Sequence, residues 1–269
     1  MGAMSRVWSG GRTVASEVVG SIRHAVGRWA QDDGDYPVVM SIERLGLYIW
    51  PGFWDAARCG AARDRIDALM GREDLVKQVD PAGSDHRVFG ADRLDPSLDI
   101  FNDPRLFRLA KQLYLEDNIV GATLAARMRY AQGNRGSGQG WHRDSPVTAQ
   151  YKFILYLSDV ELENGPFQYV LGSGARAQVW KNYLLGAASL AQYRFDDEED
   201  PRILQLNRKK VRTVAAPAGT LIIADTRGIH RGMPIQKGVR YALSNYYYAR
   251  AVPPHVAALI NGPEKRPEA

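Results

Sequence analysis

The 269-residue sequence predicts a mainly β fold with N-terminal and flanking helices, in the α+β class. Helical patterns dominate before about residue 120, whereas short β-rich segments dominate after it. The 26 glycines and 14 prolines favour the many turns that short strands require. We therefore expect one domain over 1–269, in which a helical extension, 1–119, packs on a β sandwich or barrel, 120–250, followed by a tail, 251–269.

Three helices are expected in the N-terminal half. A stripe of apolar residues predicts a helix over 13–29 that packs on the barrel or on a second subunit, which would make a homodimer. A helix lying in a membrane interface is the alternative, and two interior glycines disfavour it. A second helix is expected over 53–70, ended by Gly71. A third begins at Asp103-Pro104, an N-cap followed by proline at the first helical position.

The C-terminal half has the pattern of a series of short strands. The predicted strands are 123–131, 150–158, 167–171, 211–214, 219–224 and 239–249. Most are separated by Gly, Pro, Asn or Asp turn signals. The intervening segment 178–207, with the acidic run "DDEED", predicts a helix and a loop.

Composition is that of an ordinary globular protein with a basic balance. The net charge of +5 comes from scattered residues, which favours a solvated basic surface or, alternatively, a basic rim that attracts an anionic substrate. Cys59 is the single cysteine, so no intrachain disulfide can form. No segment approaches the ~20 apolar residues of a membrane span. We expect a cytoplasmic protein with no membrane span.

The segment "GQGWHRDSPV", 139–148, carries the first chemical signal. If it is a strand, His142 and Asp144 emerge from the same face, about 6–7 Å apart along the chain. Further on, the buried strand "TLIIAD" precedes His230, and Arg240 follows ten residues after that histidine. Two histidines and one carboxylate from separate strands form a facial triad for Fe(II), which leaves three positions for a chelating 2-oxo acid and dioxygen. Arg240 could clamp the distal carboxylate of the 2-oxo acid.

The same residues carry a family resemblance. The sequence "WHRDS", then "FILYLSDVELENGPFQYVLGSG", then "GTLIIADTRGIHRG" with "VRYALS", is similar to the phytanoyl-CoA dioxygenase family of Fe(II)/2-oxoglutarate oxygenases. The resemblance covers roughly 120–250. It implies a double-stranded β-helix, a cupin-like jelly roll whose open end holds the metal.

The resemblance also implies roles for individual residues. His142, Asp144 and His230 would be the Fe(II) ligands, and Arg240 would bind the C5 carboxylate of 2-oxoglutarate. Halogenating relatives lack the carboxylate at the Asp144 position, so its presence implies hydroxylation of a small-molecule substrate by dioxygen. Substrates of the family include acyl thioesters, amino-acid derivatives, sugars and secondary metabolites. The chain departs from the family in "LGSG", where a His is common, and at Gly232, where some relatives carry a hydroxyl.

Further residues are weaker candidates. Lys152 shares a strand face with Ile154 and Tyr156, and it binds cosubstrate if that face lines the site. Arg127 and Arg129 could contact cosubstrate or substrate in the same way, or they are surface charges. The aromatic residues Tyr130, Trp141 and "YYY" at 246–248 either line the site or pack in the core. The glycine-rich loop 131–140 is expected to form a lid.

Two other functions are compatible with parts of the pattern. A cupin-like protein that binds a metal or ligand without catalysis would keep the triad, although such proteins usually lose a ligand or the arginine. A nucleic-acid demethylase would fit the positive charge, but those enzymes carry a second Arg six residues after the cosubstrate Arg, and this chain has Tyr246 there. We therefore expect no nucleic-acid partner.

Overall fold

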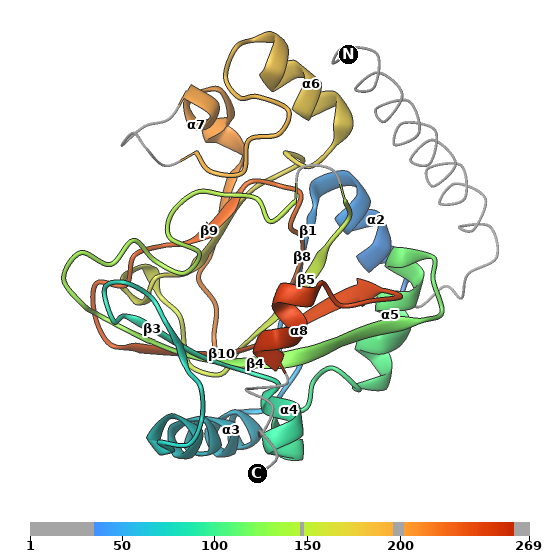
Figure 1. The fold of residues 1–269 in the computed structure, drawn as a ribbon. Coiled ribbons are helices and arrows are strands. Elements are labelled where there is room, and N and C mark those ends of the chain that lie inside the picture. Colours follow the sequence, from blue (N-terminus) through green and yellow to red (C-terminus); the bar gives the residue numbers. More distant parts are fainter. Residues whose placement is uncertain (1–34, 146–147, 196–201, 261–269) are drawn as a thin grey trace, which may run out of the picture.

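Two antiparallel sheets form the jelly roll (Figure 1). The computed structural model describes residues 35–145, 148–195 and 202–260. The larger sheet has the order β1-β8-β5-β10-β4-β3-β2, and the smaller has the order β7-β6-β9. The strands are β1 (Leu47–Trp50), β2 (Gln78–Val79), β3 (Asp85–Phe89), β4 (Ile119–Arg129), β5 (Tyr151–Tyr156), β6 (Phe167–Val170), β7 (Val211–Val214), β8 (Leu221–Asp225), β9 (His230–Gly232) and β10 (Val239–Ala249).

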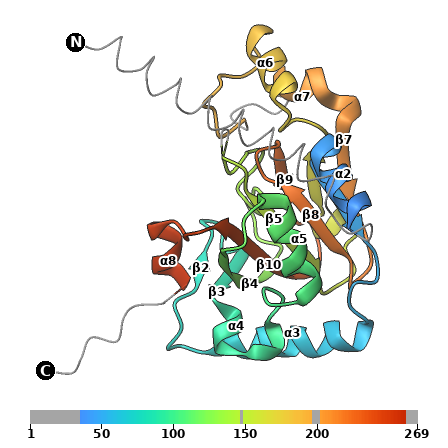
Figure 2. The ribbon, with the colours of Figure 1, turned by 90° about the vertical axis from the view of Figure 1, so that its right-hand side faces the viewer.

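Helices cover the outer face of the larger sheet and one end of the jelly roll (Figure 2). They are α2 (Tyr36–Leu45), α3 (Ala56–Gly71), α4 (Ala91–Leu94), α5 (Pro104–Tyr114), α6 (Arg176–Leu184), α7 (Arg202–Asn207) and α8 (Pro254–Ile260). The main hydrophobic core lies between α2, α3, α5 and the larger sheet. There Phe153, Leu155 and Leu243 are fully buried, so these helices fix the position of the central strands.

Strand alternation places polar residues of β5 on the inner face. Phe153 and Leu155 face the helices, whereas Lys152, Ile154 and Tyr156 line the space between the sheets. β10 pairs with β4 along its whole length and with β5 over Ala242–Tyr247, and this second register sets Tyr246 opposite Lys152. Because β5 lies between β8 and β10, the inner side chains of these strands stand on a rigid platform.

The predicted jelly-roll fold is confirmed, and each strand predicted after residue 120 corresponds to an observed one. The helix expected over 53–70 begins later, at Ala56, because the Asp55 side chain caps it by accepting from the Arg58 amide at 2.7 Å. It also runs through Gly71 rather than ending before it. The third helix begins as expected, with Asp103 as the N-cap of Pro104–Tyr114.

Strands within the first 119 residues were not foreseen. β1 pairs with β8, and β3 pairs with β4, so both complete the larger sheet. β1 has only four residues, and β3 reads "DHRVF", in which charges obscure the apolar alternation. Their pairing partners therefore decide their conformation more than their own sequence does. The segment 13–29, on which the homodimer expectation rests, lies outside the described residues. Among those described, no helix is long and apolar enough to cross a membrane.

Candidate active site

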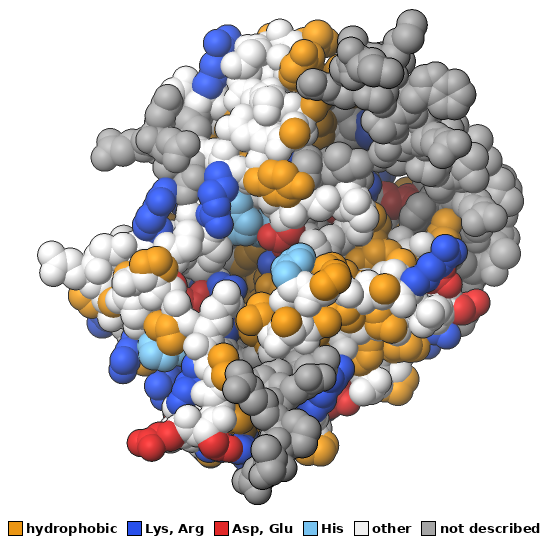
Figure 3. All heavy atoms as spheres, in the orientation of Figure 1, with side chains coloured by type: hydrophobic (Ala, Val, Ile, Leu, Met, Phe, Trp, Pro, Cys, Tyr) orange, Lys and Arg blue, Asp and Glu red, His pale blue; other side chains and the backbone are white. Residues whose placement is uncertain are grey.

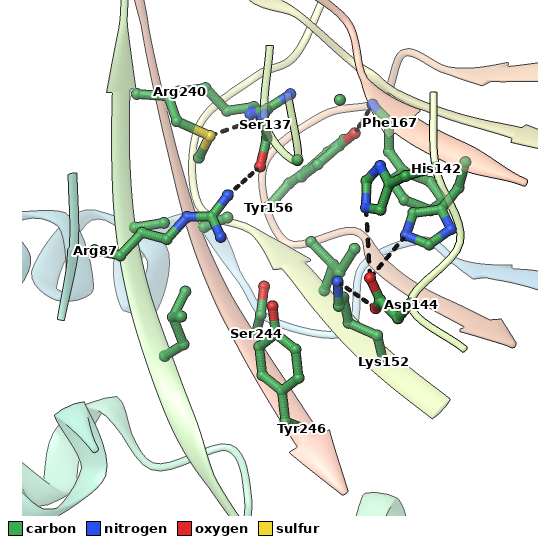
Figure 4. Close-up of a pocket in the computed structure, with 18 of the residues that line it drawn as sticks. Arg87, Ser137, His142, Asp144, Lys152, Tyr156, Phe167, Arg240, Ser244 and Tyr246 are labelled. Carbon is green, nitrogen blue, oxygen red and sulfur yellow. Dashed lines mark hydrogen bonds and ion pairs between the residues drawn. The ribbon is translucent and has the colours of Figure 1, made fainter. Parts of the chain in front are cut away.

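His142 and His230 lie side by side, with ring centroids 4.3 Å apart, and both line the pocket that Figure 4 shows. Their backbones form an isolated antiparallel bridge, in which each amide donates to the other carbonyl, at 2.9 and 2.8 Å. The Asp144 amide donates to the Thr226 carbonyl at 2.9 Å. Residues 142–144 therefore form an isolated bridge at His142 and no strand. One ligand atom from each of the three side chains lies within 4.8 Å of the other two.

Hydrogen bonds orient both imidazoles toward Asp144. The Nδ1 atom of His142 donates to the Gly140 carbonyl at 2.8 Å, and that of His230 donates to the Gly228 carbonyl at 2.9 Å. A carbonyl only accepts, so Nδ1 carries the proton and Nε2 carries the lone pair in the neutral form of each ring. These Nε2 atoms lie 3.4 Å (His142) and 3.8 Å (His230) from Asp144 Oδ1. Nε2 of His230 is buried and has no hydrogen-bond partner among the described residues.

The charge states of the cluster suit a cation. Burial on its own raises the pKa of Asp144, but the Lys152 ammonium and the two histidines lower that pKa well below its ordinary value. Burial, followed by the neighbouring His142, lowers the pKa of His230 to about 3. At neutral pH the cluster therefore offers a carboxylate anion and a neutral imidazole, the forms in which these groups bind metals. Two imidazole nitrogens and one carboxylate are also the donor set of a facial triad.

Arg240 lies in the same cavity, which has a volume of about 260 Å³. The side chain is 6% exposed, and Nη2 contacts the Met128 sulfur at 2.8 Å. Nη1 is buried without a hydrogen-bond partner within the described part of the chain. A buried guanidinium nitrogen without a partner is costly, so Nη1 fits an anion that enters the cavity.

Lys152 and Arg87 add two more cations to the wall. The Lys152 ammonium lies 3.0 Å from Asp144 Oδ2, in an ion pair. Arg87, on β3, pairs with Asp85 and donates to Ser137 Oγ at 2.8 Å. Arg87 was not predicted, because its strand lies in a region expected to be helical.

Other predicted residues lie away from the cavity. Arg127 pairs with Asp67 on the outer side of the sheet, at 2.7 Å, and Arg129 is exposed. Neither lines the cavity, because Met128, between them, takes the inward position. Tyr130 is 58% exposed, whereas Trp141 is buried in a separate apolar cluster.

The remaining wall comes from several elements. Of the three tyrosines at 246–248, Tyr246 lines the cavity and Tyr247 packs in the main core. The loop expected as a lid contributes Ser137 and Gly138. Phe167, Arg194 and Ser244 line the cavity without having been singled out. Ser244 was accessible to prediction, since it alternates with Arg240 along the predicted strand 239–249.

The jelly roll is the fold of a solved alpha-ketoglutarate-dependent enzyme, and the His-Asp-His cluster at its mouth is the donor set of a facial triad. The model of the family described as "Phytanoyl-CoA dioxygenase (PhyH)" matches residues 42–236. The chain belongs to this family, as its motifs predicted. No curated protein sequence matches it significantly.

Solved structures with the same fold include two enzymes from nogalamycin biosynthesis and HygX. The alpha-ketoglutarate-dependent epimerase SnoN from nogalamycin biosynthesis, in complex with Fe3+, alpha ketoglutarate and nogalamycin RO, has a TM-score of 0.62 and 17% identity, over 87% of this chain and 91% of its own. The carbocyclase SnoK has a TM-score of 0.55 and 16% identity, over 82% and 89%. HygX from Streptomyces hygroscopicus, with nickel, 2-oxoglutarate and hygromycin B, has a TM-score of 0.54 and 14% identity, over 81% and 88%.

Proposed function

We propose that this protein is an Fe(II)- and 2-oxoglutarate-dependent dioxygenase that hydroxylates a small molecule. The observation that carries the proposal is the convergence of His142, Asp144 and His230 on one point at the mouth of the jelly roll. Membership of the phytanoyl-CoA dioxygenase family supports it independently. The overall reaction is substrate R–H plus 2-oxoglutarate plus O2, giving R–OH, succinate and CO2. Bound iron supplies the activation of dioxygen that this reaction requires.

The three clustered side chains hold the iron in this proposal. The Nδ1 hydrogen bonds fix the tautomer and the ring orientation of both histidines, so little reorganisation accompanies metal binding. Asp144 supplies one negative charge, which favours a dication. The fit rests on this structure's own donor set, in which His230 Nε2 is buried and unpaired among the described residues.

Arg240 binds the distal carboxylate of 2-oxoglutarate. It lies on the wall of the triad's cavity, and its unpaired Nη1 is available to a carboxylate oxygen. Arg87 is a second guanidinium on that wall, but Asp85 already neutralises it. The cosubstrate carboxylate therefore binds Arg240 in preference to Arg87, because it gives a hydrogen-bond partner to a nitrogen that otherwise has none.

The substrate is an anion, such as an acyl thioester, a carboxylate, an anionic sugar or an acidic secondary metabolite. Four basic residues line the cavity. Arg87 pairs with Asp85, and Lys152 pairs with Asp144. Arg240 would take the cosubstrate, which leaves Arg194 to attract an anionic substrate. On the face shown in Figure 3, histidine and acidic side chains reach the surface near the centre, and Lys and Arg side chains lie close by. Such a field raises the local concentration of an anion.

Fe(II)-dependent formation of succinate from 2-oxoglutarate tests the proposal without a known substrate. The wild-type protein is expected to form succinate under air, and His142→Ala and Asp144→Ala are expected to abolish it. His255→Ala, an exposed histidine on α8, is the matched control. Succinate formation by Asp144→Ala at the wild-type rate would reject this metal site. If the wild-type protein binds Fe(II) and 2-oxoglutarate but forms no succinate, a non-catalytic binding module is favoured.

Epimerisation or ring closure is the second candidate, because SnoN is an epimerase and SnoK a carbocyclase. Isotopic oxygen distinguishes these reactions once a substrate is found. Hydroxylation places one atom of O2 in the product and the other in succinate. The alternatives leave the product without new oxygen.

A further inference from the structure

The two oxygens of the Asp144 carboxylate face different partners. Oδ1 faces the metal side, with the Nε2 atoms of His142 and His230 at 3.4 and 3.8 Å. Oδ2 faces the other way, toward the Lys152 ammonium at 3.0 Å, and makes no aligned hydrogen bond with any described residue. Figure 4 shows the Asp144 carboxylate with His142 on one side and Lys152 on the other.

Lys152 is fixed more firmly than an ordinary lysine. It lies on β5, paired on one side with Ala224 of β8 and on the other with Tyr246 of β10. Its ammonium lies 4.8 Å from the centre of the Tyr246 ring, and the side chain is 13% exposed. The aromatic face and the carboxylate both attract the buried ammonium and so stabilise it in this position.

We infer that Lys152 is a positioning residue that retains Asp144 Oδ2, so that Asp144 binds the metal through Oδ1 alone. This inference rests on the proposed function. Carboxylates bind metals through one oxygen or through two. If Asp144 used both, its second oxygen would occupy one of the three positions that 2-oxoglutarate and dioxygen require. Lys152 thereby protects the open positions of the site.

The alternative role, a direct contact between Lys152 and 2-oxoglutarate, has less support. The ammonium already has an anionic partner in Asp144, whereas Arg240 has an unpaired nitrogen in the same cavity. The two roles predict different results when the cosubstrate is simplified. Pyruvate retains the 2-oxo carboxylate that chelates the metal and lacks the distal carboxylate.

The test compares wild type with Lys152→Met, which keeps the length of the side chain and removes its charge. Both proteins are loaded with Co(II), whose visible d–d spectrum reports its coordination, and are then titrated with 2-oxoglutarate and with pyruvate. We expect Lys152→Met to change the Co(II) spectrum before any 2-oxo acid is added. We also expect both 2-oxo acids to bind about 10-fold or more weakly, because a second Asp144 oxygen on the metal would compete for a position that they chelate.

Lys237→Met removes an exposed lysine that pairs with Glu163 and controls for the loss of one charge. Lys152→Arg retains a cation beside Asp144 and is expected to restore most of the wild-type spectrum. Should Lys152→Met fail to fold, Lys152→Gln removes the same charge with a polar side chain, and we expect the same changes from it.

Other outcomes overturn defined statements. A changed Co(II) spectrum with unchanged affinity for both 2-oxo acids rejects the claim that Lys152 protects the open positions. An unchanged Co(II) spectrum with unchanged 2-oxo acid affinity rejects the positioning role, even if the melting temperature falls. An unchanged spectrum with a loss confined to 2-oxoglutarate rejects it in favour of a contact with the distal carboxylate. An unchanged spectrum with both acids weakened rejects it in favour of a contact with the shared 2-oxo carboxylate. If wild-type protein binds no Co(II), or if its Co(II) spectrum does not change when 2-oxoglutarate is added, the proposed function itself is rejected.

Discussion

Arg240 and Met128 lie opposite each other on β10 and β4, and the guanidinium contacts the Met128 sulfur at 2.8 Å. The sulfur is a weak acceptor, so the contact leaves Arg240 short of an anionic partner. The same register directs Met128 inward and its neighbour Arg129 outward. The register that sets Arg240 opposite Met128 therefore places Arg240 inside the cavity, where it can bind a cosubstrate, and Arg129 outside it.

Arg240→Met is expected to raise the KM for 2-oxoglutarate about 30-fold or more, because loss of a buried charge-assisted contact costs at least about 2 kcal/mol. Arg129→Met is the matched control on the neighbouring strand, and its KM is expected to stay within about twofold of wild type. Steady-state succinate formation measures both. A large effect of Arg129→Met with none of Arg240→Met would reverse the assignment.

His230→Ala is expected to weaken Co(II) or Mn(II) binding by at least about 100-fold, since even partners of metal ligands contribute 10- to 100-fold. Isothermal titration calorimetry measures the affinity directly. His255→Ala, on the exposed helix α8, should bind the metal as wild type does. Equal metal affinities for the two variants would show that the ion binds elsewhere.

Gly138→Ala is expected to weaken metal binding, because the backbone there has φ +83° and an added Cβ would overlap the His142 imidazole. Gly133→Ala is an internal control in the same loop. It has φ +78°, and no described atom outside its chain neighbours lies within 4 Å of its added Cβ. Both variants carry backbone strain of about 1–2 kcal/mol, so only the contact with His142 distinguishes them. Metal affinities that fall equally in both would contradict this interpretation.

The stability of the metal-free protein should fall in acid, in part through His230. In the folded protein its pKa is lowered to about 3, whereas an unfolded imidazole takes up a proton near its ordinary pKa of 6.5. The contribution of His230 to the free energy of unfolding is therefore complete above pH 6.5. It is lost as the pH falls toward 3, by up to about 1.4 kcal/mol per pH unit. Urea unfolding between pH 7 and pH 5 should show a steeper decline for wild type than for His230→Asn. Parallel declines would argue against a buried neutral His230.

Sequence patterns predicted which three side chains cluster at the mouth of the jelly roll better than they predicted the walls of the cavity. His142, Asp144 and His230 could be found because an HxD motif and a histidine after a buried strand together supply the donor set of a facial triad. Arg129 was expected to contact a ligand. In "LAARMR" both faces of the strand carry apolar residues, so the sequence does not indicate which face points into the jelly roll. Arg87 could not be found, since β3 becomes a strand through its pairing with β4.

The most direct test of the central claim is an anaerobic crystal structure with Mn(II) and 2-oxoglutarate. We expect one metal ion bonded to Nε2 of His142, Nε2 of His230 and a single oxygen of Asp144, chelated by the 2-oxo carboxylate, with the distal carboxylate on Arg240. An ion bound away from these three side chains, or 2-oxoglutarate bound without contact to the ion, would contradict the account.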